Sequence, residues 1–196
     1  DAVAMGGQLN TATGSRSVVI GGEHNNAIGY ESSVFGGDWN KAMGDTALAA
    51  GGISNEAAGD YSLALGGSSN ESRGLYSVTI AGISNEAAGN YSLALGGSSN
   101  ESRGLYSVTI AGISNAATAE NTITAGGRNN KATALGAGAF GGASNDATGT
   151  RSLTAGGENN MAAGLETVTV GGQDNLASGD LAATLGGRGN IAYSDN

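Results

Sequence analysis

The chain contains no cysteine and no proline, and aromatic residues make up only 5% of its 196 residues. Without cysteine there is no disulfide framework, no thiol nucleophile and no thiolate metal site. Large side chains for a thick core are also scarce, because much of the 39% hydrophobic content is alanine. This composition argues against an ordinary globular domain.

Positive charge is scarce as well. Eight Lys and Arg residues stand against seventeen Asp and Glu residues, which gives a formal net charge of −9. Binding to nucleic acid or to anionic lipid needs clustered positive charge, so we expect neither as a partner. No apolar run approaches the roughly 20 residues of a membrane helix, and no signal peptide opens the sequence.

Glycine is abundant instead, with 37 residues, and it recurs with a strict period. A small residue followed by Gly returns every fifteen residues without insertion, and an Asn follows each pair in register. The consensus is GGxxNxAxGxxSxxx, and residues 53–82 and 83–112 differ only where Asp60 becomes Asn90. A fixed period of this kind predicts a repeat architecture, whereas glycine without a period would indicate disorder.

Each repeat has room for two short strands between two glycine-bounded turns. The first strand follows the Asn, as at residues 10–13, and the second covers stretches such as 17–20 and 77–80. Strands this short are stable only when each coil stacks on the next and pairs with it in parallel. The glycine density and the missing 3.6-residue period exclude helix. We therefore predict an all-β parallel β-solenoid, with residues 1–196 forming a single repeat domain of thirteen 15-residue coils.

Alternation along the second strand separates a face of large aliphatic residues from a face of small ones. A two-stranded coil encloses a narrow interior, so we place small residues such as Ser62 and Ala64 inside it. The aliphatic column then points outward, and self-association would bury it, which predicts an obligate homo-oligomer. The alternative assignment places the aliphatic residues inside the coil. The expected subunit interface consists of Val18, Ile20, Leu63, Leu65, Val78, Ile80, Leu93, Leu95, Val108, Ile110, Val168 and Val170.

The recurrent Gly and Asn residues are interpreted as turn residues. Glycine permits positive φ or close backbone approach, and the Asn amides can bond from coil to coil in a ladder. A phosphate-binding glycine loop would occur once, between a strand and a helix, and not in every repeat. We expect no cofactor and no metal, and no catalytic residues can be singled out, so an enzyme is not expected.

The glycine-asparagine coil with an SVxI-type strand closely resembles the YadA-like head repeat of trimeric autotransporter adhesins. Residues 17–21 (SVVIG) and 62–66 (SLALG) match its SVAIG-type core, and the GGxxNxAxGxxS spacing is most similar to the heads of Moraxella ubiquitous surface proteins. The resemblance spans essentially the whole chain. It implies a left-handed parallel β-roll and a homotrimer on the outer membrane surface of a Gram-negative bacterium.

The resemblance also implies a function in attachment. The expected partners are a host-cell receptor, an extracellular-matrix protein of the collagen, fibronectin or laminin type, or another bacterium. The stalk and the C-terminal membrane anchor of the family are not in this sequence, so we expect a head fragment. Ala119, Ala134 and Ser194 replace the second-turn glycine, and residues 137–139 lack the usual large side chain. We therefore expect the coils at residues 116–140 to be less regular.

Outward positions vary between coils, and specificity is expected there. One register holds Tyr61, Tyr76, Tyr91 and Tyr106, which could brace the roll by stacking or form an adhesive patch. A neighbouring register holds Glu56, Glu71, Glu86 and Glu101. Arg73 and Arg103 stand two residues after Glu71 and Glu101, so we favour pairing of Glu with Arg between subunits. A site for a cation or a basic partner is the alternative.

His24 and Trp39 are single residues at variable turn positions. A lone His without clustered carboxylates is interpreted as a surface residue, and Trp39 as a cap over a coil edge or an exposed anchor. Three rival functions follow other patterns. A spacer that projects another domain fits the regular coils, and an ice-binding solenoid would use threonine pairs such as those at 122–124 and 167–169. Calcium-binding rolls need a nine-residue period, which is not found here.

Overall fold

The computed structural model describes residues 1–193. Within these residues the chain is an all-β parallel β-solenoid of about thirteen coils, with roughly 15 residues in each and no helix. The predicted fold class and period are thereby confirmed. Residues 1–99 and residues 100–196 form two compact units, and each unit is built from the same kind of coil.

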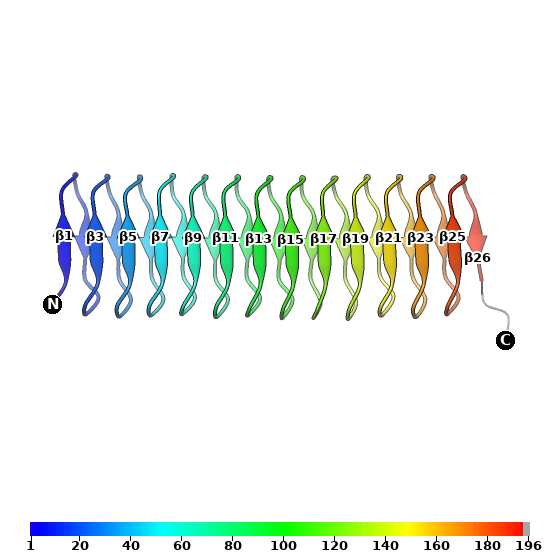
Figure 1. The fold of residues 1–196 in the computed structure, drawn as a ribbon, viewed down its shortest axis with the longest axis horizontal. Coiled ribbons are helices and arrows are strands. Elements are labelled where there is room, and N and C mark those ends of the chain that lie inside the picture. Colours follow the sequence, from blue (N-terminus) through cyan, green and yellow to red (C-terminus); the bar gives the residue numbers. More distant parts are fainter. Residues whose placement is uncertain (194–196) are drawn as a thin grey trace. The chain divides into compact units, whose positions relative to one another are not determined.

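In the unit of residues 1–99, three-residue strands follow one another along one side of the coils (Figure 1). These strands are β1 (Val3–Met5), β3 (Val18–Ile20), β5 (Ser33–Phe35), β7 (Leu48–Ala50), β9 (Leu63–Leu65), β11 (Val78–Ile80) and β13 (Leu93–Leu95). Two-residue strands form the other side of the same coils. They are β2 (Thr11–Ala12), β4 (Asn26–Ala27), β6 (Lys41–Ala42), β8 (Glu56–Ala57), β10 (Glu71–Ser72) and β12 (Glu86–Ala87).

The unit of residues 100–196 repeats this arrangement. Its two-residue strands are β14 (Glu101–Ser102), β16 (Ala116–Ala117), β18 (Lys131–Ala132), β20 (Asp146–Ala147), β22 (Met161–Ala162), β24 (Leu176–Ala177) and β26 (Ile191–Ala192). Its three-residue strands are β15 (Val108–Ile110), β17 (Ile123–Ala125), β19 (Gly138–Phe140), β21 (Leu153–Ala155), β23 (Val168–Val170) and β25 (Ala183–Leu185).

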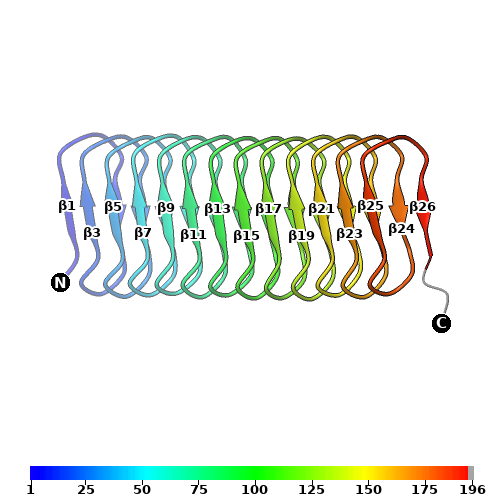
Figure 2. The same ribbon diagram turned by 45° about the vertical axis from the view of Figure 1, so that its right-hand side comes forward.

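Strand pairing follows the sequence period. Val78 of β11 lies opposite Leu63 of β9 on one side and Leu93 of β13 on the other, and all three strands are parallel. Equivalent residues of successive coils therefore form columns, as the period predicted. A third ladder of single bridges, beginning with Gln8 opposite Glu23, runs along the turn after the glycine pair and was not predicted. Figure 2 shows how tight loops join the two strands of a coil at both ends.

The interior of the coils is lined by small side chains. Ala64 and Thr79 of the three-residue strands and Ala57 of the opposite strand have no solvent exposure. Val19 and Val34 are the largest aliphatic residues that are fully buried. This confirms the placement of small residues inside, and the alternative with the large aliphatic residues inside is wrong. The coil is too narrow for them, since backbone from both strands encloses it on two sides.

From Asn25 to Asn175, the asparagine that follows each glycine pair is buried, and it bonds within its own coil and to the next coil. Asn70 donates from Nδ2 to the carbonyl oxygens of Gly66 (3.0 Å) and Gly82 (3.2 Å). Its Oδ1 accepts the backbone N–H of Asn85 at 3.0 Å. Buried polar groups are stable only when they are hydrogen-bonded, and both the Nδ2 and the Oδ1 of this amide meet that requirement. The predicted coil-to-coil ladder of amides is confirmed.

The two glycines of each pair have different roles. Gly66 and Gly67 both have positive φ, at 67° and 75°. A Cβ on Gly66 would meet nothing within 4 Å, whereas a Cβ on Gly67 would lie 2.3 Å from the carbonyl oxygen of Gly82. This explains why Ala81 and Ala111 replace only the first glycine of a pair.

Some non-glycine turn residues also adopt left-handed backbone conformations, which are rare for bulky side chains. Tyr61 and Tyr76 have φ of 56° and 55°, and His24 has φ of 54°. The conformation directs the backbone N–H toward the preceding coil. The N–H of Tyr61 donates to the carbonyl of Asp45 (2.8 Å), and that of Tyr76 to the carbonyl of Asp60 (3.0 Å). These bonds offset the local strain.

The expected irregularity at residues 116–140 does not occur. Ile123 of β17 lies opposite Gly138 of β19 in the usual register, and Lys131 of β18 opposite Ala116 of β16. The ring of Phe140 occupies the space that a side chain at residue 138 would fill. A Cβ on Gly138 would lie only 2.8 Å from Cε2 of that ring. The second-turn alanines at 119 and 134 are accommodated half-buried, and Ser194 lies outside the described residues.

Candidate functional site

A column of aliphatic side chains faces outward from the three-residue strands in each unit. All twelve residues of the expected subunit interface are half-buried or exposed in the single chain. Ile20, Ile80 and Val170 expose 43%, 38% and 38% of their surface. Large apolar side chains that recur at one register form an extended apolar surface, which is typical of an interaction site.

The tyrosine column lies on a turn beside the strands. In the unit of residues 1–99, the rings of Tyr61 and Tyr76 stack with centroids 4.8 Å apart, and those of Tyr76 and Tyr91 with centroids 5.2 Å apart. Tyr106 occupies the same register in the other unit. Each stacked pair stabilises by about 0.5–1.5 kcal/mol beyond its buried area. Each of the three stacked tyrosines remains 45% exposed, so these rings can both brace the coils and contact a partner.

The glutamate column lies at the start of the two-residue strands, and all four glutamates are half-buried. Arg73 pairs with Glu71 of its own coil and, at 2.7 Å, with Glu86 of the next coil. Arg103 pairs with Glu101 at 3.0 Å. Arg73 and Arg103 therefore pair with glutamates of their own chain, and the favoured pairing between subunits stays a prediction. An arginine can reach the column because neighbouring coils bring two carboxylates within the length of its side chain.

The threonine pairs point into the coil. Thr122, Thr124, Thr167 and Thr169 are all buried, and Thr122 donates its hydroxyl to the carbonyl of Ala119 at 2.6 Å. An ice-binding plane needs threonine hydroxyls and methyls on an exposed flat face. These threonines therefore offer no support for the ice-binding alternative.

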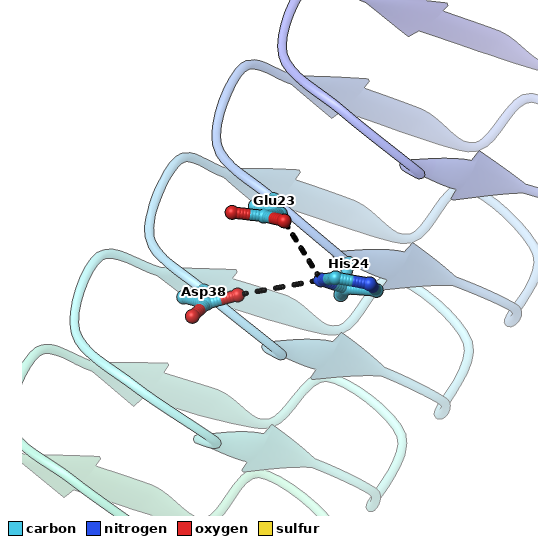
Figure 3. A group of neighbouring side chains, drawn as sticks. All are labelled: Glu23, His24 and Asp38. Atoms are coloured by element: carbon cyan, nitrogen blue, oxygen red, sulfur yellow. Dashed lines mark ion pairs between the residues drawn. The ribbon is translucent and has the colours of Figure 1, made fainter.

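A polar cluster lies on the turn ladder of residues 21–40 and is shown in Figure 3. Nδ1 of His24 is 3.5 Å from a carboxylate oxygen of Glu23 and 3.8 Å from one of Asp38. The imidazole stacks on the ring of Trp39, with centroids 4.2 Å apart and planes 7° apart. Nδ1 of His24 and Oδ1 of Asp38 are both buried and have no hydrogen-bond partner.

The sequence interpretation of His24 as a surface residue without clustered carboxylates is wrong. The fifteen-residue period places Glu23 and Asp38 in one column, where they are opposite one another in the turn ladder. It also places His24 and Trp39 in the adjacent column. Aligning the repeats by column, with the turn residues included, would have revealed the cluster. Trp39 stacks on the imidazole and is 52% exposed, and its expected roles as a cap over a coil edge or as an exposed anchor stay predictions.

A second polar group, on the opposite turn, is exposed. Arg16 donates from Nη1 to the hydroxyl of Tyr30 and to a carboxylate oxygen of Glu31, both at 2.7 Å. The hydrogen bond from Arg16 lowers the pKa of Glu31 below its ordinary value. The hydrogen-bonding carboxylate of Glu31 raises the pKa of Tyr30. Surface ion pairs of this kind contribute little to stability.

No family model matches the chain, and neither does any curated protein. The described residues form no helix long and apolar enough to cross a membrane.

Proposed function

We propose that this chain is the head segment of a bacterial surface adhesin of the trimeric autotransporter type. In this proposal the solenoid is a left-handed β-roll, three chains associate about one axis, and the variable outer columns contact the partner. The observation that carries the proposal is the apolar column on the three-residue strands. The resemblance of the GGxxNxAxGxxS repeat to YadA-like heads supports the trimer and the surface location.

The apolar column supports self-association because it recurs at one register in nearly every coil. Leu63, Val78 and Leu93 lie opposite one another in successive strands, so their side chains form one surface along the unit. Full burial of a side chain of this size stabilises by about 1.5–3 kcal/mol. An identical chain carries the same column at the same spacing, so a second copy matches it in register along its length.

The tyrosine column is the proposed contact surface for a host-cell receptor, a matrix protein or another bacterium. Its rings are stacked, so they lose little conformational freedom when a partner binds. They are also half-exposed, and tyrosine is enriched at protein interfaces. The ion-paired glutamates beside them add a polar border.

Assembly is tested first by the mass of the purified chain in solution, measured by light scattering. The proposal expects the mass of three chains. Leu63→Glu combined with Val78→Glu, which places charge on the apolar column, is expected to give monomers. Tyr30→Ser, on a different face of the coil, serves as the matched control and is expected to leave the trimer intact. A wild-type chain that remains monomeric would overturn the proposal.

Adhesion is tested on cells and on immobilised collagen, fibronectin and laminin. The variant with all four column tyrosines changed to serine is expected to lose at least about tenfold in binding, since aromatic residues dominate interface energetics. Tyr30→Ser removes a tyrosine outside the column and should bind as the wild type does. The trimer mass is measured for every variant, so a loss of binding through lost assembly is recognised. Unchanged binding by an intact quadruple variant would contradict the adhesive column.

A further inference from the structure

We propose that Glu23, His24 and Asp38 bind one divalent transition-metal ion of the zinc type. The three side chains each offer one ligand atom, and these atoms lie within 4.8 Å of one another. The chemistry suits zinc, which accepts imidazole nitrogen and carboxylate oxygen together. The proposed site is separate from the apolar and tyrosine columns and does not depend on adhesion.

The distances suit a shared ion better than direct hydrogen bonds. Ligand atoms about 2.0–2.2 Å from a tetrahedral zinc ion lie roughly 3.3–3.6 Å from one another. Nδ1 of His24 is 3.5 Å from the carboxylate of Glu23 and 3.8 Å from that of Asp38. Direct N–H···O hydrogen bonds are shorter, at about 2.7–3.2 Å.

Two of the three ligand atoms are unsatisfied. Nδ1 of His24 and Oδ1 of Asp38 are shielded from solvent, and neither has a hydrogen-bond partner. Leaving a buried polar atom without a partner costs about 1–3 kcal/mol. A metal ion between them would remove this cost for both atoms at once.

The backbone holds the cluster in place. The N–H of His24 donates to the carbonyl of Gln8, and the N–H of Trp39 to the carbonyl of Glu23, both at 3.0 Å. The Trp39 ring lies parallel to the imidazole and restricts its rotation. Nδ1 of His24 is directed at the two carboxylates (Figure 3). Side chains fixed before binding lose less entropy when the ion arrives.

The ligand set also indicates which ions to exclude. Calcium and magnesium prefer sites made of oxygen atoms alone, whereas an imidazole ligand favours zinc, copper or nickel. Three protein ligands leave a fourth tetrahedral position for water. Zinc is therefore the ion used to test the site, and calcium serves as the negative control.

The test is calorimetric titration of the untagged, metal-free chain with zinc chloride. We expect saturable binding with one ion per chain, no comparable signal with calcium chloride, and a change in the fluorescence of Trp39, which is the single tryptophan of the chain. His24→Ser introduces the residue that occupies the same turn position at Ser54 with nearly the same φ. It is expected to weaken zinc binding by at least about tenfold, as is the isosteric Asp38→Asn.

The matched control is Glu158→Gln. Glu158 occupies the same column as Glu23 in a different coil, but Asn159 follows it in place of a histidine. Zinc binding by this variant should equal that of the wild type. Circular dichroism confirms that each variant is folded. The absence of saturable zinc binding, or equal binding by folded His24→Ser and Asp38→Asn variants, would overturn the proposed site.

Discussion

The turn at residues 21–25 and the turn at residues 51–55 share one backbone but carry different chemistry. His24 and Ser54 have φ of 54° and 55°. Asn25 and Asn55 each donate from Nδ2 to a glycine carbonyl of their own turn and to a glycine carbonyl of the next turn. The first turn nevertheless presents a stacked imidazole between carboxylates, and the second a small hydroxyl. The coil therefore tolerates different outer residues because its glycines and asparagines alone define the turn.

This comparison separates two kinds of position. Substitutions at positions that all coils share should lower stability strongly, wherever along the chain they are made. Substitutions at positions that differ between coils should change stability little and alter local chemistry instead.

The largest effect is expected at the second glycine of a pair. Gly67→Ala would place a Cβ 2.3 Å from the carbonyl oxygen of Gly82 and 2.5 Å from Nδ2 of Asn70, and the backbone there has a φ of 75°. Neither neighbour can move without breaking a hydrogen bond between coils. We expect the free energy of unfolding to fall by more than about 4 kcal/mol. The measurement is thermal and urea unfolding, monitored by circular dichroism.

Gly66→Ala is the matched control for this prediction. The same methyl group at Gly66 meets nothing within 4 Å, and Ala81 already occupies the equivalent place with a φ of 58°. The cost of left-handed φ, about 1–2 kcal/mol, is partly offset by the lower entropy of the unfolded alanine chain. If both substitutions lowered the stability equally, the second glycine would be required only for its positive φ, and not for its close contact with the next coil.

The next largest effect is expected at the asparagine ladder. Asn70→Ala removes the donor to Gly66 and Gly82 and leaves the buried backbone N–H of Asn85 without its acceptor. Each buried polar group left without a partner costs about 1–3 kcal/mol, so we expect the free energy of unfolding to fall by about 3 kcal/mol in total. The measurement is again urea unfolding.

Ser69→Ala changes the exposed neighbour of Asn70 and is the control for the ladder. Ser69 has a φ of 56° and is one of the positions that differ between coils. Because the backbone there already adopts this φ with a side chain present, we expect a change within about 0.5 kcal/mol. If Ser69→Ala lowered the free energy of unfolding as much as Asn70→Ala does, the separation of shared and variable positions would be contradicted.

The shared positions are also those that could be predicted from the sequence. The period of Gly and Asn identified the coils, the parallel pairing and the amide ladder, because these residue types have few roles other than turns when they recur in every repeat. The contrast between Leu63 and Ala64 identified the inner and outer faces, since a narrow coil admits only the smaller side chain.

The variable positions were harder to interpret. The left-handed backbone at Tyr61 has no signal in the residue type, because tyrosine rarely adopts that conformation. The regular coils at residues 116–140 were missed because the ring of Phe140 fills the space above Gly138 from two residues away. The cluster at His24 depends on residues of adjacent coils, so it becomes visible only when the turn residues are aligned by column.

The smallest effect is expected at Asp146, at a variable position of β20. Burial raises the pKa of its carboxyl above the ordinary value, and the nearby charge of Lys131 offsets this only in part. The folded chain therefore holds this proton more strongly than the unfolded chain does. Stability should fall as the pH rises from the ordinary pKa of an aspartate through the raised pKa, and the ionised carboxylate should then destabilise the fold slightly at neutral pH.

Asp146→Asn removes this titration and places an amide where Asn26 occurs in β4. We expect the variant to be slightly more stable than the wild type near neutral pH, and no more stable in acid, where Asp146 is already protonated. Thermal unfolding at both pH values measures the difference. Asp60→Asn removes the same charge from an exposed turn, at the position that Asn90 occupies two coils later. It therefore separates the effect of burial from the effect of the net charge of −9. An equal gain in both variants would assign the effect to overall charge, because a change in net charge acts wherever the carboxylate lies.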